Sequence, residues 1–412
     1  MKKIELLAPA GDLKKLKMAV LYGADAVYLG GEKYSLRAGA KNFSLDEMKD
    51  GINFAHSYGK KVYITANIVA QNADIDGVKE YFEQLYNMKA DAIIVSDPAF
   101  LLIAKKYIPD MELHLSTQAN TTNFMTANFW HYNGIKRIVP ARELSFKELV
   151  ELKEKINPNL EIEIFVHGAM CMSYSGRCLI SSFLTGRDAN RGDCAQPCRW
   201  KYSLVEEKRP GEYFPVIEDE RGSFFFNSKD LCLIQEIDKI IEAGIDSIKI
   251  EGRVKSAYYV ATIVRSYRKA IDDYYADPEN YKFDETLLDE IKKASYRNFT
   301  KAFFYDSQNM KDSQNYESSS YVQNYDFVGF VKKYDDQKQM AVVQQRNKFQ
   351  VGDEVEIIGP HTEMIKTKIY DIHNLSGEKL DVSNVPMQEV YVDFKTELKE
   401  NYIIRRVKDN LL

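Results

Sequence analysis

The chain has 412 residues, of which 45% are hydrophobic, so it is long enough for two domains and for a large buried core. Its formal net charge of −5 excludes a uniformly basic, nucleic-acid-coating protein, although local basic patches remain open. No apolar run reaches the roughly 18–20 residues that cross a bilayer, and Glu5 interrupts the short apolar stretch at the start, so we expect a cytoplasmic protein without membrane contact.

Residues 1–276 alternate β-rich runs with amphipathic helical patterns. The runs begin at about residues 4, 26, 61, 92, 111, 136, 160 and 247. Eight parallel strands joined by crossover helices predict a TIM-like (β/α)8 barrel, which we take as the catalytic domain. A doubly wound open sheet is the alternative.

Four of the five cysteines lie in one segment, with six residues between Cys171 and Cys178 and three between Cys194 and Cys198. Clustered thiols in a reducing compartment favour metal binding, with buried free cysteines or a disulfide as the alternatives. Structural zinc sites usually pair ligands two to four residues apart, which only the second pair satisfies, so the spacing favours a [4Fe–4S] cluster on all four. Cys232 lies among apolar residues at helical spacing and is interpreted as a core cysteine, in reserve as fourth ligand.

Polar residues follow the predicted strands where catalytic groups of such barrels lie, at the carboxyl ends, and we expect them to ring one pocket. They are Asn67, Asp97, Ser116, Gln118, Asn120, Arg142, Glu143, His167, Glu251 and Arg253. Of these, we take Asn67, Gln118, Arg142, His167, Glu251 and Arg253 as the candidate catalytic residues. Any single one could instead cap a helix, and Asn123 and Ser145 are expected to do so.

The composition changes to polar, loop-forming sequence at about 277–324, which predicts a linker with a helical extension. Residues 325–412 then show short alternating strands and predict a small antiparallel β-barrel. Its FQVGDEVEIIGP phrase resembles β-barrels of translation factors that touch RNA. We expect this domain to recruit RNA through cationic side chains, namely Lys332, Lys333, Arg346, Lys348, Arg405 and Arg406.

The segment EIFVHGAMCMSYSGRCLIS, Glu163 to Ser181, resembles the signature of the peptidase U32, or collagenase-like, family. Further phrases look like the same family: LLAPAGDLKKLKMAVLYGADAVYLGG, STQANTTN, RGDCAQPCRW, FNSKDLCLI and IKIEGRVKS. Together they span most of residues 4–275. The C-terminal region is similar to that of the longer members, the tRNA hydroxylation branch.

Despite the family's name, the resemblance implies an iron–sulfur-dependent hydroxylation activity. Branches of the family act on wobble uridine 34 of tRNA, giving 5-hydroxyuridine, on a cytidine of large-subunit ribosomal RNA, or on a ubiquinone precursor. The two-domain length favours the tRNA branch, with prephenate as the co-substrate. In this reading Arg142, Lys249 and Arg253 bind the dicarboxylate, and Arg177 offsets the thiolate charge.

The resemblance also bears on the ligands and partners. Cys171, Cys178 and Cys194 match three of the family's ligands, whereas the fourth differs between branches, so Cys198 is a prediction of ours. The implied partners are tRNA and a paralogous U32 subunit. We expect an oxygen-sensitive cluster to be lost, or replaced by zinc, during aerobic purification.

Three alternatives remain at this point. A U32 peptidase could use Cys171 with His167, although the sequence has no HExxH or GxSxG motif and only six histidines. The target could be ribosomal RNA. Finally, the cysteines could bind structural zinc in a non-catalytic scaffold.

Overall fold

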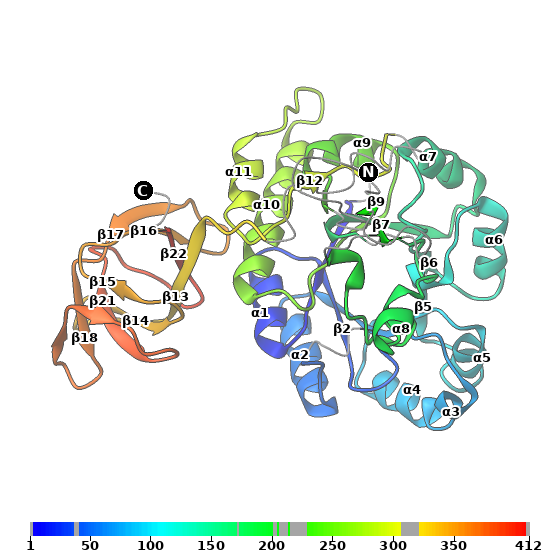
Figure 1. Cartoon of the computed structure of the whole chain (residues 1–412), viewed down its shortest axis with the longest axis horizontal. Coiled ribbons are helices and arrows are strands. Elements are labelled where there is room, and N and C mark those ends of the chain that lie inside the picture. The colour runs from blue at the N-terminus through cyan, green and yellow to red at the C-terminus, as the bar shows by residue number, and fades with distance from the viewer. Residues whose placement is uncertain are drawn as a thin grey trace.

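A closed barrel of eight parallel strands forms the larger part of the molecule (Figure 1). The computed structural model describes residues 3–36, 41–170, 173–200, 204–205, 213–214, 229–305 and 321–408. Strand β11 pairs in parallel with both β7 and β1 and so closes the ring, which confirms the TIM-like barrel and makes the open sheet wrong. The barrel strands are β1 (Glu5–Pro9), β2 (Ala26–Gly30), β3 (Lys61–Ala66), β4 (Ala92–Val95), β5 (Glu112–Leu115), β6 (Arg137–Ile138), β7 (Glu161–Ala169) and β11 (Ser247–Ile250).

Helices surround the barrel because each has one apolar face to bury against the strands. Side-chain caps fix where several begin: Asn123 accepts from Thr126 N at 2.9 Å, and Ser145 forms a capping box with Glu148, so both predicted caps are confirmed. The helices are α1 (Leu13–Leu21), α2 (Leu45–Ser57), α3 (Asn72–Ile75), α4 (Val78–Asn87), α5 (Pro98–Tyr107), α6 (Phe124–Tyr132), α7 (Phe146–Lys155), α9 (Ile237–Glu242) and α10 (Ala257–Ala276). No helix in the described part of the chain is both long and apolar enough to cross a membrane.

The barrel interior contains a buried ionic network as well as apolar side chains. Arg137 is buried and pairs with Glu161 at 2.8 Å and Glu163 at 3.2 Å, and it also donates to Glu5. Glu163 accepts a second ion pair from Lys249 at 2.8 Å. Because each buried charge has partners of opposite sign, the network is stable inside the barrel.

The segment between β7 and β11 adds structure beyond the barrel. β7 continues past the ring and pairs antiparallel with β10 (Asp230–Cys232), which pairs with β12 (Phe299–Thr300). Cys232 therefore lies on a strand, so the helix expected there is wrong, whereas its burial in the core is confirmed. The segment also contains α8 (Ile180–Thr185), the 3₁₀ helices η2 (Ala189–Arg191) and η3 (Pro197–Arg199), and the paired strands β8 (Leu204–Val205) and β9 (Tyr213–Phe214). Cys171 lies outside the described residues.

The C-terminal part is an eight-stranded antiparallel sheet that curls around its own apolar core. Its order is β17-β16-β22-β13-β14-β21-β18-β19, and the two edge strands do not pair with each other within the described residues. The strands are β13 (Tyr325–Asp335), β14 (Met340–Gln345), β16 (Glu354–Ile358), β17 (Ile365–Lys368), β18 (Asp371–Asn374), β19 (Lys379–Leu380), β21 (Glu389–Asp393) and β22 (Ile403–Val407), beside a small ladder of β15 (Phe349–Gln350) and β20 (Val382–Ser383).

This sheet packs against the barrel through α1, α10 and α11 (Thr286–Lys292). The Tyr22 hydroxyl donates to Ile358 O at 3.0 Å, and Arg405, which is 0% exposed, pairs with Glu290 at 2.6 Å and Glu356 at 2.8 Å. Arg406 pairs with an aspartate and is largely covered. The expectation that these two arginines meet RNA is therefore wrong, because their charges are used within the protein.

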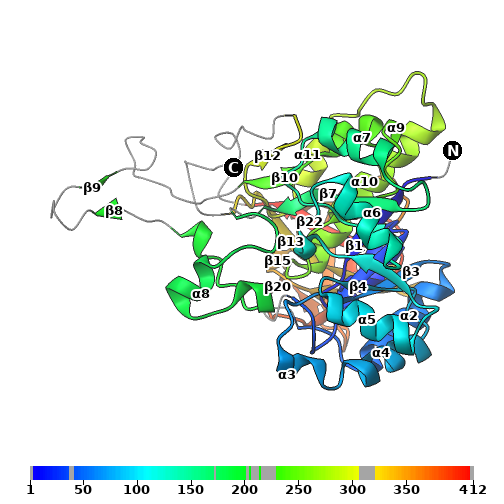
Figure 2. The ribbon, with the colours of Figure 1, turned by 90° about the vertical axis from the view of Figure 1, so that its right-hand side faces the viewer.

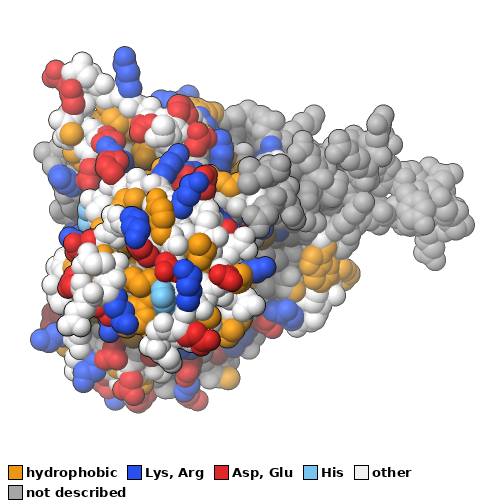
Figure 3. Space-filling view, turned by 90° about the vertical axis from the view of Figure 1, so that its left-hand side faces the viewer, with side chains coloured by type: hydrophobic (Ala, Val, Ile, Leu, Met, Phe, Trp, Pro, Cys, Tyr) orange, Lys and Arg blue, Asp and Glu red, His pale blue; other side chains and the backbone are white. Residues whose placement is uncertain are grey.

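The outer face of the C-terminal sheet carries both signs of charge. Figure 3 shows Lys and Arg side chains interspersed with Asp and Glu on it. The C-terminal part also contains ion pairs such as Lys368–Glu354 and Lys395–Asp393. A mixed surface has a weaker long-range attraction for phosphates than a single-sign patch has.

Candidate functional site at the carboxyl ends of the barrel strands

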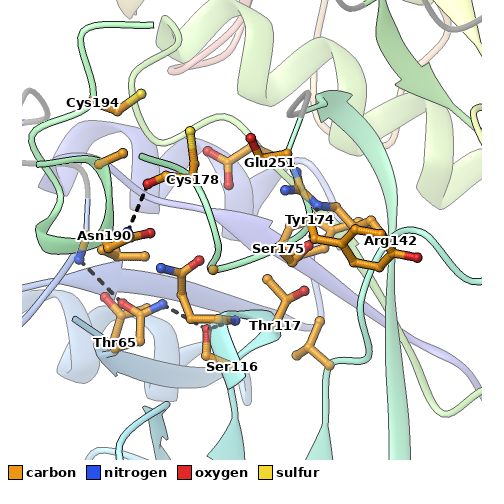
Figure 4. Close-up of a pocket in the computed structure, with 18 of the residues that line it drawn as sticks. Thr65, Ser116, Thr117, Arg142, Tyr174, Ser175, Cys178, Asn190, Cys194 and Glu251 are labelled. Atoms are coloured by element: carbon orange, nitrogen blue, oxygen red, sulfur yellow. Dashed lines mark hydrogen bonds between the residues drawn. The ribbon is translucent and has the colours of Figure 1, made fainter. Parts of the chain in front are cut away.

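A cavity of about 130 Å³ lies at the carboxyl ends of the strands, between the barrel and residues 173–200, which we call the cysteine segment (Figure 4). Its lining includes six of the ten strand-end residues expected there, namely Asn67, Ser116, Gln118, Arg142, Glu251 and Arg253, and also Lys249, which was expected to bind the co-substrate. It also includes side chains that the sequence analysis did not select, among them Tyr28, Thr65, Thr117, Phe165 and Tyr174. The first four lie near strand ends, so the same positional rule could have found them.

Three of the expected polar residues do not line the cavity but hold neighbouring structure in place. Asp97 caps α5 by accepting from Ala99 N at 2.8 Å. Asn120 donates to Ser175 O at 2.9 Å, and Glu143 accepts from Ser175 N at 3.1 Å. The last two residues therefore fasten the start of the cysteine segment to the barrel.

Gly176 lets the cysteine segment cross very close to the barrel. Its φ is +76°, and a Cβ at this position would lie 2.3 Å from Gln118 O. A side chain would be strained by both the backbone conformation and the contact. The close crossing brings Ser175 and Gly176 into the cavity lining.

His167 does not line the cavity, which contradicts its predicted place in the pocket. Its ring is 1% exposed and packs 5.6 Å from the ring of Tyr267 and 5.6 Å from that of Phe299. Burial, with a smaller contribution from the charge of Lys255, lowers the pKa of His167 to about 3. The imidazole is therefore neutral at physiological pH and serves as part of the core.

A β-bulge explains where His167 points. In a regular strand it would share a face with Glu163 and Phe165, which point into the barrel and the cavity. However, the pairing of β7 with β11 shifts after Phe165–Lys249, so that His167 pairs with Ile250 and Val166 is the additional residue. The bulge turns His167 outward.

Three cationic side chains face the cavity near Glu251. Arg253 is buried and donates to Ser35 Oγ at 2.9 Å, Thr65 Oγ1 at 3.2 Å and a backbone carbonyl. The Lys249 ammonium lies 2.8 Å from Glu163, and Arg142 donates to Ala169 O at 3.3 Å. Positive charge held in this way favours an anionic ligand, and a guanidinium can contact both oxygens of a carboxylate.

The cations also lie against aromatic rings in the same cavity. The ammonium of Lys249 is 4.4 Å from the ring centroid of Tyr28, and the guanidinium carbon of Arg142 is 5.6 Å from that of Phe165. These contacts add to the orientation of the charged groups. Arg177, in contrast, is exposed and does not line the cavity.

Cys178, Cys194 and Cys198 all line the cavity, and none forms a disulfide among the residues that the structure describes. Gln196 N donates to Cys194 Sγ at 3.3 Å, a type of contact that stabilises a thiolate ligand. Thiol donors of this kind fit an iron–sulfur cluster. Without Cys171, which lies outside the described ranges, no three His, Cys, Asp or Glu side chains are arranged to hold a metal ion, so the convergence of all four cysteines stays a prediction.

Cys232 is remote from this group. It does not line the cavity, and burial raises the pKa of its thiol to about 11. A thiol that resists deprotonation is a poor ligand. The structure therefore gives no support to Cys232 as the reserve ligand, and Cys198 has the better position.

A surface ion pair fastens the cysteine segment on the other side of the cavity. Arg191 contacts Asp74 of α3 at 2.6 and 2.9 Å, and Val69 N donates to Asn190 O at 3.1 Å. Asn190 in turn donates to Cys178 O at 2.9 Å. No feature of the sequence around Asp74 identifies this role, because the pairing joins residues that are far apart in the chain.

The fold and the site define a TIM-barrel protein with a cationic, cysteine-lined cavity at the carboxyl ends of its strands. The chain belongs to peptidase family U32: the family model matches residues 11–314, and that of the U32 C-terminal domain matches residues 323–405. The resemblance seen in the sequence is thereby confirmed.

Several relatives carry names from RNA modification. The chain is 44% identical over 407 residues to tRNA hydroxylation protein P1 of Bacillus subtilis, covering 99% of this chain and 96% of the relative. It is 37% identical to tRNA hydroxylation protein P of Escherichia coli, covering 98% and 96%. It is also 37% identical to the Escherichia coli 23S rRNA 5-hydroxycytidine C2501 synthase, covering 66% of this chain but 39% of that protein.

Proposed function

We propose that this protein hydroxylates RNA, that its substrate is tRNA, and that its product is 5-hydroxyuridine at wobble position 34. The observation that carries the proposal is the similarity to tRNA hydroxylation proteins over nearly the full length of both chains, including both domains. The similarity to the ribosomal RNA synthase covers a smaller part of the chain, and this favours tRNA over ribosomal RNA.

The cavity supports this chemistry with groups suited to a dicarboxylate and to a nucleobase. Arg142, Lys249 and Arg253 would bind the carboxylates of prephenate, the proposed co-substrate. Asn67, which donates to Ser116 Oγ at 3.0 Å, and Gln118 supply amide groups for the polar edge of a uracil. A base reaches such a cavity only after it leaves the stack of its neighbours.

The proposed cofactor is a [4Fe–4S] cluster held by Cys171, Cys178, Cys194 and Cys198, three of which line the cavity. When bound, such a cluster supplies redox chemistry, or a site for the oxygen donor, next to the substrate. The residues of the chain position the substrates, and the cysteine segment covers one side of the cavity. Partnership with a paralogous U32 subunit stays a prediction.

The geometry gives little support to a peptidase. A cysteine peptidase needs a thiol next to a histidine, and His167 points away from the cavity into the core. The lining of the cavity in the described residues contains no histidine. Cysteine proteolysis would therefore need a histidine base that the described lining of the cavity does not offer.

Nucleoside mass spectrometry of bulk tRNA from a deletion strain tests the proposal. We expect 5-hydroxyuridine derivatives to disappear, to return with the wild-type gene, and to stay absent with Cys178→Ser. Cys232→Ala is the matched control, because Cys232 lies outside the cavity, and it should restore the modification. Iron analysis of anaerobically purified protein should show iron in the wild type and the control but much less in Cys178→Ser.

Two results would contradict the proposal. Unchanged 5-hydroxyuridine in the deletion strain would remove the tRNA substrate, and loss of 5-hydroxycytidine from ribosomal RNA would identify the alternative target. A colourless anaerobic protein with one zinc ion, and full modification by Cys178→Ser, would favour a structural metal over an iron–sulfur cluster.

A further inference from the structure

Helix α8 has one face toward the cavity and one face toward solvent. On the inner side Ile180 lines the cavity, and Ser181 Oγ, which is fully buried, accepts from Ala195 N at 3.0 Å. Leu179 and Phe183 are four residues apart and both exposed, and we call their side the outer face of α8. Figure 2 shows α8 standing clear of the barrel body.

The outer face of α8 is unusually apolar for a surface. Phe183 is 87% exposed and Leu179 is 70% exposed. Burial of such side chains stabilises a protein, and that stabilisation is not gained here. Contiguous exposed apolar side chains mark an interaction site more often than isolated ones do.

The surrounding charge indicates the kind of partner. Residues 173–200 contain four arginines (Arg177, Arg187, Arg191, Arg199), two aspartates (Asp188, Asp193) and no lysine or glutamate, whereas the whole chain is acidic. Arg187 pairs with Asp193 at 2.7 Å and Arg191 with Asp74, so the exposed Arg177 is the side chain through which the positive charge of this segment would meet a phosphate. A positive segment with exposed aromatic side chains is typical of surfaces that bind single-stranded nucleic acid, because phosphates contact the arginines while bases stack on the rings.

The position of the surface agrees with such a partner. Tyr174, which is half exposed, lines the cavity itself, and α8 follows four residues after Gly176, where the segment crosses over Gln118. Nucleotides next to a base in the cavity therefore lie close to Tyr174 and to the start of α8. Stacking on a ring needs unpaired bases, since bases within a duplex are already stacked.

We propose that the outer face of α8, together with Tyr174, binds the unpaired nucleotides that flank the modified base of the RNA substrate. This inference rests on the proposed function, because it takes RNA as the substrate of the cavity. It assigns to Phe183 a binding role that is separate from the chemistry and from the cysteine ligands.

The test compares Phe183→Ala, Phe183→Trp and the wild-type full chain in binding to a labelled hairpin RNA that carries the anticodon loop. We expect Phe183→Ala to weaken binding about tenfold, because a stacked base contributes at that scale. Phe183→Trp should bind as well as the wild type, since it keeps a ring. Phe129→Ala is the matched control, because Phe129 is also exposed but lies on α6, and it should bind normally.

Folding and specificity are measured in the same series. The side chain of Phe183 is mostly in solvent, so its variants should melt at the wild-type temperature. Binding to a perfect duplex of the hairpin stem should be equal for all variants. Equal hairpin binding by Phe183→Ala and wild type, or no hairpin binding by the wild type, would overturn the inference.

Two further outcomes separate the possible failures. If Phe183→Ala turns a wild-type dimer into a monomer, the outer face binds a second copy of the chain and the inference is wrong. If Phe183→Ala weakens hairpin binding while the deletion strain retains its 5-hydroxyuridine, the proposed reaction fails and the RNA-binding surface stands.

Discussion

The neutral, buried His167 should make the protein less stable in mild acid. Its folded-state pKa of about 3 lies far below the ordinary value of 6.5, so the unfolded chain binds a proton in the interval between them while the folded chain does not. The stability that His167 contributes is therefore complete above pH 6.5 and is lost as the pH falls toward 3. Between pH 7 and pH 5 the loss amounts to about 2 kcal/mol.

The variant His167→Phe isolates this effect. Phenylalanine keeps an aromatic ring among Tyr259, Tyr267 and Phe299 but has no titratable group. Urea unfolding of both full-length proteins at pH 7 and pH 5 gives the free energies of unfolding. We expect the wild type to lose about 2 kcal/mol more than the variant.

If the wild type and His167→Phe lose the same free energy of unfolding between pH 7 and pH 5, the assignment of a neutral, buried His167 is refuted. Such a result would mean that His167 is accessible to protons in the folded state. A catalytic role would then again be open, and hydroxylation by His167→Phe would decide it. With the observed packing, we expect this variant to retain activity at pH 7.

Three further substitutions test the ionic contacts. Glu163→Gln should lower the free energy of unfolding by about 3 kcal/mol, measured by urea unfolding, because it leaves buried Arg137 and its network short of negative charge. Arg405→Met should have an effect of similar size at the domain interface and should make the linker more sensitive to protease in a limited-digestion assay. Arg191→Ala should free the cysteine segment from Asp74, so that protease cuts within residues 173–200 and iron is lost faster, while circular dichroism of the barrel stays unchanged.

The barrel could be predicted from the sequence because its signals are local. Each of the eight strands begins within one residue of the expected position, since apolar runs and turn residues mark both ends. β10 and β12 were missed because they have three and two residues and are held by pairing with the extension of β7. The apolar residues at helical spacing after Cys232 belong to α9. They led to the prediction of a helix at Cys232, where the structure has β10.

Part of the candidate site could also be predicted from the sequence, because the barrel fixes where the ends of its strands lie. Strand ends converge in any such barrel, so Asn67, Gln118 and Arg253 could be placed from position alone. The error at His167 comes from a bulge, which no local pattern in β7 reveals. Arg405 was misplaced because its charge is satisfied by Glu290 and Glu356, residues that only the folded interface brings near.

The position of the cysteine segment in the chain determines when its thiols are synthesised relative to the closure of the barrel. The segment lies between β7 and β11, and β11 closes the ring on β1, so the thiols leave the ribosome before the ring can close. At roughly 5–20 residues per second, several seconds separate Cys171 from the completed β11. The chain leaves the barrel at β7 and returns to it at β11, and these two strands pair directly with each other. The ring of strands is therefore complete without any contribution from the cysteine segment, and a cofactor bound by its thiols would not be needed to close the barrel.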